Sequence, residues 1–162
     1  MRHMICGCVA ALSLGAGAGA MNLVVNGGFE TGDFTGWTFN AASGTTTVGA
    51  VTFPGQYAAF FGTFDAGWDS LEQSVTTTAG VEYTLRVYVL NYGVGDDGIA
   101  ISLNGNEVYR AEPLFTPLEQ WRQIELGFLA QGAVTTFAIS GGDNIASIGL
   151  DDAQREDLKH AV

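Results

Sequence analysis

The chain has 162 residues, 47% hydrophobic and 14% charged, and is long enough to bury the core of one ordinary domain. Its six Lys and Arg residues are outnumbered by seventeen Asp and Glu residues, which gives a formal net charge of −11. This balance argues against nucleic acids and anionic membrane surfaces as partners, because both are bound through clustered basic side chains. It suits neutral glycans, cationic surfaces and calcium, although acidity that serves only solubility explains it equally well.

Residues 1–20 have the pattern of a secretion signal peptide. A basic start at Arg2 is followed by a short apolar stretch that ends at Leu14, and residues 18–20 (AGA) form an A-x-A cleavage site. A buried N-terminal helix is the alternative, but four glycines in the segment would weaken it. We therefore expect a secreted protein, extracellular or periplasmic, whose mature chain is residues 21–162.

Cleavage of this signal would change the chemistry of the chain. It would remove both cysteines, Cys6 and Cys8, so the mature chain would have no thiol and no disulfide. It would also remove Arg2, leaving five basic and seventeen acidic residues and a formal charge of −12. No later run reaches the roughly 18 apolar residues of a transmembrane helix, so we expect no membrane span.

The mature chain predicts β-structure throughout, because short runs of β-branched and aromatic residues alternate with Gly, Asn and Asp turns. Residues 83–92 alternate between two faces with the period of a half-buried strand, and Asn104-Gly105 is a strong hairpin signal. With no convincing amphipathic helix, the pattern predicts an all-β antiparallel β-sandwich. The expected strands are 23–29, 36–40, 45–52, 57–62, 69–77, 81–92, 97–104, 106–110, 121–129, 133–140 and 146–154.

Four segments in order carry a resemblance to a known family: 22–37 (NLVVNGGFETGDFTGW), 57–62 (YAAFFG), 69–83 (DSLEQSVTTTAGVEY) and 149–152 (GLDD). They resemble carbohydrate-binding modules of the CBM4/9 type, within the galactose-binding-like superfamily. The resemblance implies a jelly-roll-like β-sandwich over residues 21–154, followed by a polar tail, 155–162. It extends to bacterial secreted proteins that usually end in a PEP-CTERM sorting signal. Residues 153–162 have no such signal, so we expect the protein to be free outside the cytoplasm.

The same resemblance implies a structural calcium ion. By position, its ligands are the carbonyl of Gly28 and the carboxylates of Glu30 and Asp151, with Asp152 ranked second because it should face the other way. Calcium takes six to eight oxygen ligands, and here it would clip the first and last strands together. The family often adds a carboxylate before its middle strand, where this chain offers only a backbone oxygen such as that of Tyr57. The alternative is that these acids hydrogen-bond turn amides without a metal.

Catalytic machinery is not indicated by the residue types present. His160 is the only histidine of the mature chain, so Ser–His–Asp, Cys–His and His- or Cys-based zinc sites are excluded. A carboxylate pair could hydrolyse glycosides, but among seventeen acids some pair will be suitably spaced by chance. Asp96, Asp97 and Asp143 are more simply solvated loop residues. We expect a protein that is not an enzyme.

Aromatic and polar side chains outside the core parity predict a binding face. Arg86, Tyr88 and Tyr92 share the outward parity of the longest strand, and Trp121 and Glu125 share that of another. If the two strands are neighbours, these side chains form an aromatic–polar platform on which a pyranose ring could stack. A second buried face would account for them equally well.

One glutamine and two tryptophans outside these two strands also bear on binding. Gln73 is a further candidate for the platform, Trp37 has a position typical of core packing, and Trp68 is the best exposed aromatic because it lies in a loop. The candidate ligand-binding residues are Trp68, Arg86, Tyr88, Tyr92 and Trp121.

We therefore expect a secreted, non-catalytic carbohydrate-binding module that binds extracellular or cell-surface polysaccharide and holds a structural calcium ion. The alternative is an extracellular matrix or adhesion protein that uses the same sandwich to bind proteins or itself. A small glycosidase is a third reading, supported only by the abundance of acids. Sandwich folds carry many unrelated functions, so the site has to distinguish these readings.

Overall fold

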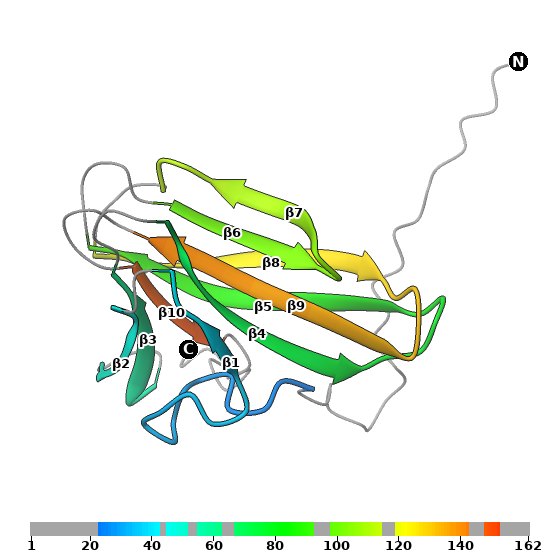
Figure 1. Cartoon of the computed structure of the whole chain (residues 1–162), viewed down its shortest axis with the longest axis horizontal. Coiled ribbons are helices and arrows are strands. Elements are labelled where there is room, and N and C mark those ends of the chain that lie inside the picture. The colour runs from blue at the N-terminus through cyan, green and yellow to red at the C-terminus, as the bar shows by residue number, and fades with distance from the viewer. Residues whose placement is uncertain are drawn as a thin grey trace, which may run out of the picture.

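The computed structural model describes residues 23–42, 45–51, 55–62, 67–92, 98–114, 119–142 and 148–152, and it shows two β-sheets packed face to face (Figure 1). The predicted signal peptide and polar tail lie outside the described residues. The strands are β1 (Thr38–Asn40), β2 (Thr47–Ala50), β3 (Tyr57–Phe61), β4 (Asp69–Thr76), β5 (Glu82–Asn91), β6 (Gly98–Leu103), β7 (Asn106–Ala111), β8 (Trp121–Leu129), β9 (Val134–Gly142) and β10 (Ile148–Asp152).

Sheet A has the strand order β1-β4-β9-β6-β7, and sheet B has the order β2-β3-β10-β5-β8. All of the strand pairs are antiparallel. The predicted all-β antiparallel sandwich is therefore confirmed. Within the described ranges, no helix is long and apolar enough to cross a membrane.

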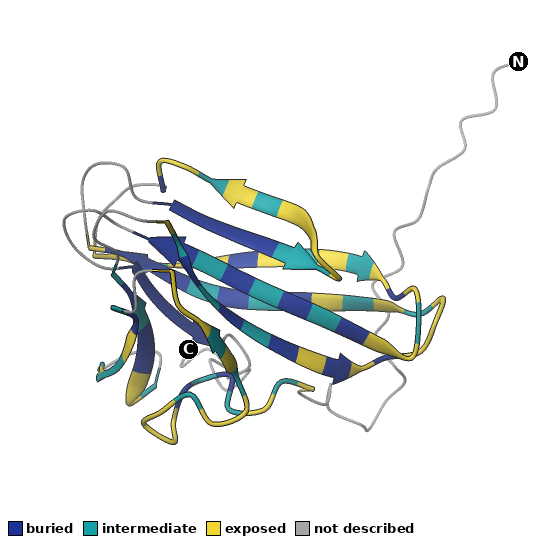
Figure 2. Cartoon of the chain, viewed as in Figure 1, coloured by how far each residue is buried: buried dark blue, intermediate teal, exposed yellow. Residues whose placement is uncertain are grey.

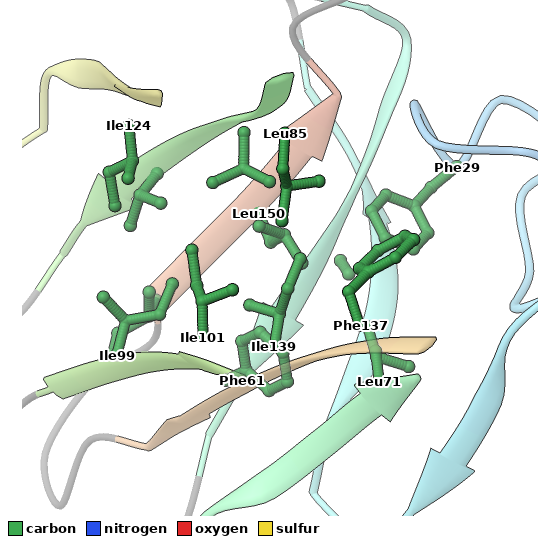
Figure 3. Packing of buried hydrophobic residues seen from close by; sticks show 14 of the residues in the cluster. Phe29, Phe61, Leu71, Leu85, Ile99, Ile101, Ile124, Phe137, Ile139 and Leu150 are labelled. Atoms are coloured by element: carbon green, nitrogen blue, oxygen red, sulfur yellow. The ribbon is translucent and has the colours of Figure 1, made fainter. Parts of the chain in front are cut away.

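The core lies between the two sheets and is built by the period-two alternation of their strands. In β4, and over Leu85–Val89 of β5, buried residues alternate with half-buried or exposed ones (Figure 2). The inward side chains of both sheets meet in one apolar cluster (Figure 3), as expected for a half-buried strand face. Its labelled members are Phe29, Phe61, Leu71, Leu85, Ile99, Ile101, Ile124, Phe137, Ile139 and Leu150.

The hairpin between β6 and β7 is as predicted. Asn104 and Gly105 have φ angles of 49° and 78°, which are the left-handed values that an Asn-Gly turn of type I′ requires. Trp37 also packs as expected, since its ring lies 5.4 Å from that of Phe29 and 5.6 Å from that of Phe137.

The predicted first strand, 23–29, is wrong: the chain runs through turns in this segment. Asn26 and Phe29 have φ angles of 50° and 52°, which a strand does not allow. The backbone of Val25 instead pairs with the side chain of Gln73, which accepts from its N–H at 2.7 Å and donates to its carbonyl at 2.9 Å. A side-chain amide here takes the place of a neighbouring strand.

Candidate binding site

The outer face of sheet A has a floor of small side chains. The register places Ser70 of β4 opposite Ser140 of β9, Ser140 opposite Ala100 of β6, and Ala100 opposite Arg110 of β7. Because alternate residues of these strands fill the core, Ser and Ala are the side chains that line the outside. Larger side chains at the margin of this floor therefore stand above it and leave a hollow.

That hollow is a pocket of about 380 Å³. An aromatic ring, part of an ion-pair network and hydroxyl groups line it, so an apolar surface and hydrogen-bonding groups face the same space. Among the residues that line it are Trp68, Ala100, Ser102, Glu107, Arg110 and Ser140.

Trp68 forms the aromatic wall of the pocket. It immediately precedes β4 and is half-buried, and its ring lies so close to Gly98 that a Cβ atom there would be 2.5 Å from Cζ2. The guanidinium carbon of Arg110 lies 4.7 Å from the ring centroid, which is a cation–π contact. The neighbouring Asp69 is fully buried and accepts hydrogen bonds from the backbone of Ala42 and from Thr46, so the strand end beside Trp68 is firmly anchored.

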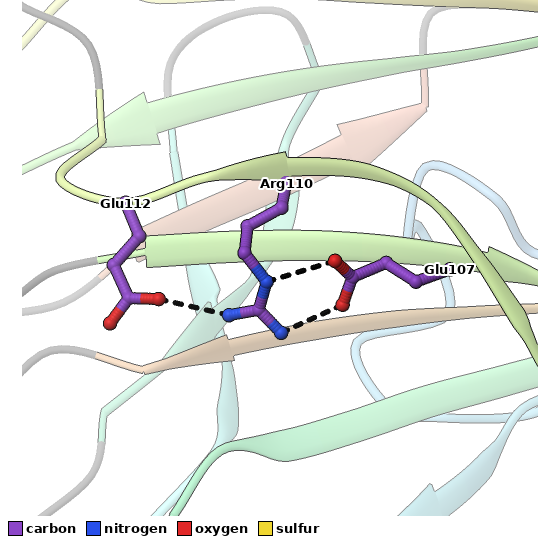
Figure 4. Close-up of polar contacts among 3 residues, drawn as sticks. All are labelled: Glu107, Arg110 and Glu112. Carbon is purple, nitrogen blue, oxygen red and sulfur yellow. Dashed lines mark hydrogen bonds and ion pairs between the residues drawn. The ribbon is translucent and has the colours of Figure 1, made fainter.

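Arg110 is held in place by two carboxylates (Figure 4). Its Nε and Nη2 atoms donate to the two oxygens of Glu107 at 2.9 and 2.7 Å, and Nη1 donates to Oε2 of Glu112 at 2.9 Å. Hydrogen bonds from Arg110 lower the pKa of Glu107, and the two carboxylates raise the pKa of Arg110 above its usual range. Glu107 and Arg110 therefore stay charged, and with Glu112 they form an array of donors and acceptors around one guanidinium.

A β-bulge brings Glu107 and Arg110 to the same face of sheet A. Residues three apart on a regular strand point to opposite faces, but the pairing of β6 with β7 shifts after Ile101, so that Ser102 pairs with Glu107. Val108 is the extra residue of the bulge. Glu107 and Arg110 consequently lie on the same face, which is why period-two reasoning missed them. The signal in the sequence is the run Glu-Val-Tyr-Arg-Ala-Glu, in which one Arg has two acidic neighbours.

The predicted ligand-binding residues fall on two opposite faces. Trp68 lies on the outer face of sheet A, whereas Arg86, Tyr88 and Trp121 lie on that of sheet B, where β5 and β8 are neighbours as the platform required. There Arg86 donates to Glu125 at 2.9 Å. The structure therefore does not bring the five residues into one site.

The sheet B face carries a second aromatic group. Tyr92 lies with its ring 6.1 Å from that of Phe60, a residue not singled out from the sequence. The rings of Phe60 and Trp121 meet above Gly149, since a Cβ there would lie 3.4 and 3.1 Å from them. Gln73 is not part of this platform, because its side chain is buried in the other sheet against Val25.

The residues predicted to bind calcium converge at one end of sheet B. Asp151 is 2% exposed and lies in β10 opposite Tyr88. A Cβ atom at Gly28 would lie 3.3 Å from Oδ1 of Asp151 and 3.6 Å from Cγ of Glu30. A Cβ at Gly55 would overlap Oε1 of Glu30 and lie 3.6 Å from Oδ2 of Asp151. Two carboxylates thus face the same point, and glycines leave the room around them.

Glu30 also makes the hydrogen bonds expected if no metal is bound. Its Oε1 accepts from the backbone N–H groups of Gln56 at 2.8 Å and Tyr57 at 3.4 Å. Asp151 has other contacts, but its buried Oδ2 accepts no hydrogen bond among the described residues. The described chain holds no group of three His, Cys, Asp or Glu side chains suited to a metal, so carbonyls and water would have to complete the ligand set. Asp152 pairs through its backbone with Val87, and its side chain lies outside the described residues.

No protein-family model matches the chain, and no curated protein matches it. Solved structures do. TmCBM61, in complex with β-1,4-galactotriose, is 24% identical with a TM-score of 0.64, and the match covers 82% of this chain and 96% of that one. The chain has the fold of carbohydrate-binding modules. The CBM22-1 xylan-binding domain of Paenibacillus barcinonensis Xyn10C shares this carbohydrate-binding-module fold at 19% identity and a TM-score of 0.52, over 77% of this chain and 87% of that one.

The fold also occurs in larger proteins. The CBM22-1–GH10 modules of Clostridium thermocellum Xyn10B, complexed with xylohexaose, match at 19% identity and a TM-score of 0.53, over 74% of this chain and 25% of theirs. The enzymatically active domain of bacteriophage CBA120 tailspike protein 4 matches at 15% identity and a TM-score of 0.60, over 80% of this chain and 20% of that one. The carbohydrate-binding-module fold by itself therefore does not decide between binding and catalysis.

Proposed function

We propose that this protein is a secreted, non-catalytic carbohydrate-binding module of the CBM4/9 type that binds extracellular or cell-surface polysaccharide in the pocket beside Trp68. The observation that carries the proposal is the pocket itself, an aromatic wall next to a planar network of hydrogen-bonding charges on the outer face of sheet A. The neighbours support it, since TmCBM61 and Xyn10B are complexed with β-1,4-galactotriose and xylohexaose.

The chemistry of a sugar matches both parts of this pocket. A pyranose ring has apolar C–H faces, which the part of the Trp68 indole left open by Arg110 can cover, and a rim of hydroxyl groups. Arg110 has five N–H donors, of which three are used on Glu107 and Glu112. The remaining donors and the carboxylate oxygens can bind hydroxyls in the plane of the network, and Ser102 and Ser140 add hydroxyls from the floor.

The ion pairs also make this pocket a poor glycosidase site. Glycoside hydrolysis needs a carboxylic acid whose raised pKa keeps it protonated, ready to donate to the leaving oxygen. The pKa of Glu107 is lowered by its hydrogen bonds to Arg110, and Glu112 is paired with the same guanidinium. Glu107 is therefore not tuned to donate a proton, which supports binding without catalysis.

The proposal includes a structural calcium ion held by the carboxylates of Glu30 and Asp151 and the carbonyl of Gly28. Hard oxygen ligands of this kind are those that calcium prefers. Two converging carboxylates, one of them buried, repel each other, and a cation between them would turn that repulsion into attraction. The ion would tie the N-terminal turn to β10 rather than join two strands as the sequence suggested, and its role would be stability.

The test is native affinity electrophoresis of the purified protein in gels that contain a panel of polysaccharides, with calcium and with EDTA. We expect retardation by one class of glycan, lost in Trp68→Ala and kept in Trp121→Ala, whose ring lies on the opposite face. Retardation that depends on Trp121 instead would move the site to sheet B. A folded protein that no glycan retards, but that associates with itself, would overturn the proposal in favour of a matrix or adhesion protein.

A further inference from the structure

The charges on the outer face of sheet A are unbalanced. The outward positions of its strands carry Glu72, Glu107 and Arg110, and Glu112 lies just beyond the end of β7. At these outward positions of the described strands, Arg110 is the only cationic residue. The face therefore has a net negative charge, within a chain whose formal charge is already −11. Such a field attracts cations and repels anions before any contact is made.

The one cation of the pocket is already committed. Arg110 lies on the face of Trp68, with both oxygens of Glu107 in its fork and Oε2 of Glu112 on its third nitrogen. A glycan carboxylate or sulfate would have to displace Glu107 from this bidentate pair while entering a negative field. Sugars that carry acidic groups are therefore poor ligands for this pocket.

A protonated amine finds the opposite situation. An ammonium group has three donors and no acceptor, and it forms short, strong hydrogen bonds with carboxylates. Arg110 uses a single oxygen of Glu112, so that carboxylate offers further acceptor sites beside the guanidinium, and its side chain is 47% exposed. A hydroxyl at the same place could also donate to the carboxylate, but it carries no positive charge and so lacks the attraction between opposite charges.

We propose that the pocket beside Trp68 prefers glycans built of amino sugars with free, protonated amino groups. The sugar ring packs on the part of the indole that Arg110 leaves open, and its ammonium group lies against Glu112 and Glu107 while its hydroxyls reach the remaining donors of Arg110. This inference rests on the proposed function and names the chemical class of its ligand. It assigns Glu107 and Glu112 a second role, as specificity residues in addition to holding Arg110.

Three matched oligosaccharides test the inference by calorimetric titration of the whole protein in mildly acidic, low-salt buffer. Oligomers of β-1,4-linked glucosamine, N-acetylglucosamine and glucose share one backbone and differ in the group at C2, which is ammonium, acetamide or hydroxyl. We expect the glucosamine oligomer to bind about tenfold more tightly than the glucose oligomer, because an ammonium–carboxylate ion pair replaces a hydrogen bond from an uncharged hydroxyl. Added salt should shrink the difference.

Paired variants separate the pocket from the general charge of the protein. Glu112→Gln should remove most of the preference for the ammonium group while the glucose oligomer still binds, since Gln keeps an oxygen acceptor. Glu82→Gln, an exposed position of β5 in the other sheet, removes the same charge and should leave the preference unchanged.

The outcomes distinguish the two proposals. Equal affinity for the three oligomers, lost in Trp68→Ala, would overturn the amino-sugar inference and leave the proposed function standing. A preference that falls equally in Glu112→Gln and Glu82→Gln would show non-specific attraction to a polycation and would also overturn it. No binding of these or any other glycan would be a failure of the proposed function itself.

Discussion

The guanidinium carbon of Arg110 lies 4.7 Å from the centre of the Trp68 ring, although the two residues belong to β7 and to the loop before β4, with two other strands of sheet A between those strands. The contact reaches across because the intervening β9 and β6 present Ser140 and Ala100, which are too small to stand in the way. The pocket thus depends on the bulge at Val108, on the loop that carries Trp68, and on the floor formed by Ser140 and Ala100.

Arg110→Lys tests whether the planar fork, rather than its positive charge, serves the ligand. A lysine keeps the charge but cannot bridge Glu107 and Glu112 or stack flat on Trp68. We expect the affinity for whichever polysaccharide retards the protein to fall about tenfold, with little change in melting temperature because surface ion pairs stabilise little. Electrophoretic retardation and thermal unfolding measure the two effects.

Arg86→Lys is the control, since Arg86 donates to Glu125 on the opposite face. It should leave the affinity unchanged. Equal losses in both variants would mean that the ligand does not use the pocket on sheet A.

Gly98→Ala tests the position of the Trp68 ring. The new methyl group would lie 2.5 Å from Cζ2 of the indole and 3.1 Å from the carbonyl oxygen of Ala111, so the ring has to move. We expect a loss of about 1–3 kcal/mol in the free energy of unfolding, as for other overpacked sites, together with weaker glycan binding and altered tryptophan fluorescence. Gly127→Ala on β8, where nothing lies within 4 Å, is the matched control. A Gly98→Ala protein with wild-type affinity would argue against Trp68 as a ligand contact.

Asp33, in the turns that follow the segment predicted as the first strand, gives a pH prediction. Asp33 accepts hydrogen bonds from the hydroxyl of Thr31 at 2.6 Å and the N–H of Thr35 at 2.9 Å, and these lower its pKa from the ordinary 3.8. A carboxylate whose pKa is depressed by folding contributes stability that is complete above its unfolded pKa and is lost as the pH falls through the folded value.

Asp33→Asn should therefore lower the melting temperature at neutral pH. At pH values below the folded pKa of Asp33, the variant and the wild type should melt at the same temperature. Melting curves measured from neutral to strongly acidic pH for both proteins provide the comparison. A difference that stays constant across the whole range would contradict the assignment to the Asp33 carboxylate.

Much of the fold follows from local patterns, and most of the pocket does not. The alternation in residues 83–92 and the Asn104-Gly105 turn are local signals; the structure has a strand at Glu82–Asn91 that alternates over Leu85–Val89, and it has the predicted turn. The error at 23–29 arose because apolar residues there suggested a strand, whereas their partner is the distant side chain of Gln73.

The pocket depends on non-local facts. Trp68 was identified as an exposed aromatic, but its partner Arg110 lies on a strand whose place in the sheet only pairing across the strands decides. The bulge at Val108 then reverses the parity that would have separated Glu107 from Arg110. A single sequence shows neither the strand order nor the bulge, so the aromatic wall was predicted and the ion pairs were not.

Asp151→Asn distinguishes a calcium site from a pair of hydrogen-bonded acids. If calcium binds, the wild-type protein gains melting temperature with added calcium by mass action and loses it with EDTA. The buried carboxylate of Asp151 faces that of Glu30, so the two would share one ion. Calcium should therefore no longer raise the melting temperature of the variant, and its difference from wild type should be smaller in EDTA than in calcium. Thermal unfolding in the two buffers measures both effects.

Glu125→Gln is the control, since it removes a carboxylate of sheet B that is 51% exposed and should keep the calcium response. If Asp151 only holds the fold by hydrogen bonding, Asp151→Asn will lose the same stability with calcium and with EDTA, and wild type will respond to neither. In that case the two carboxylates at this end of sheet B stabilise the fold without a metal, and the proposed binding pocket on sheet A does not depend on calcium.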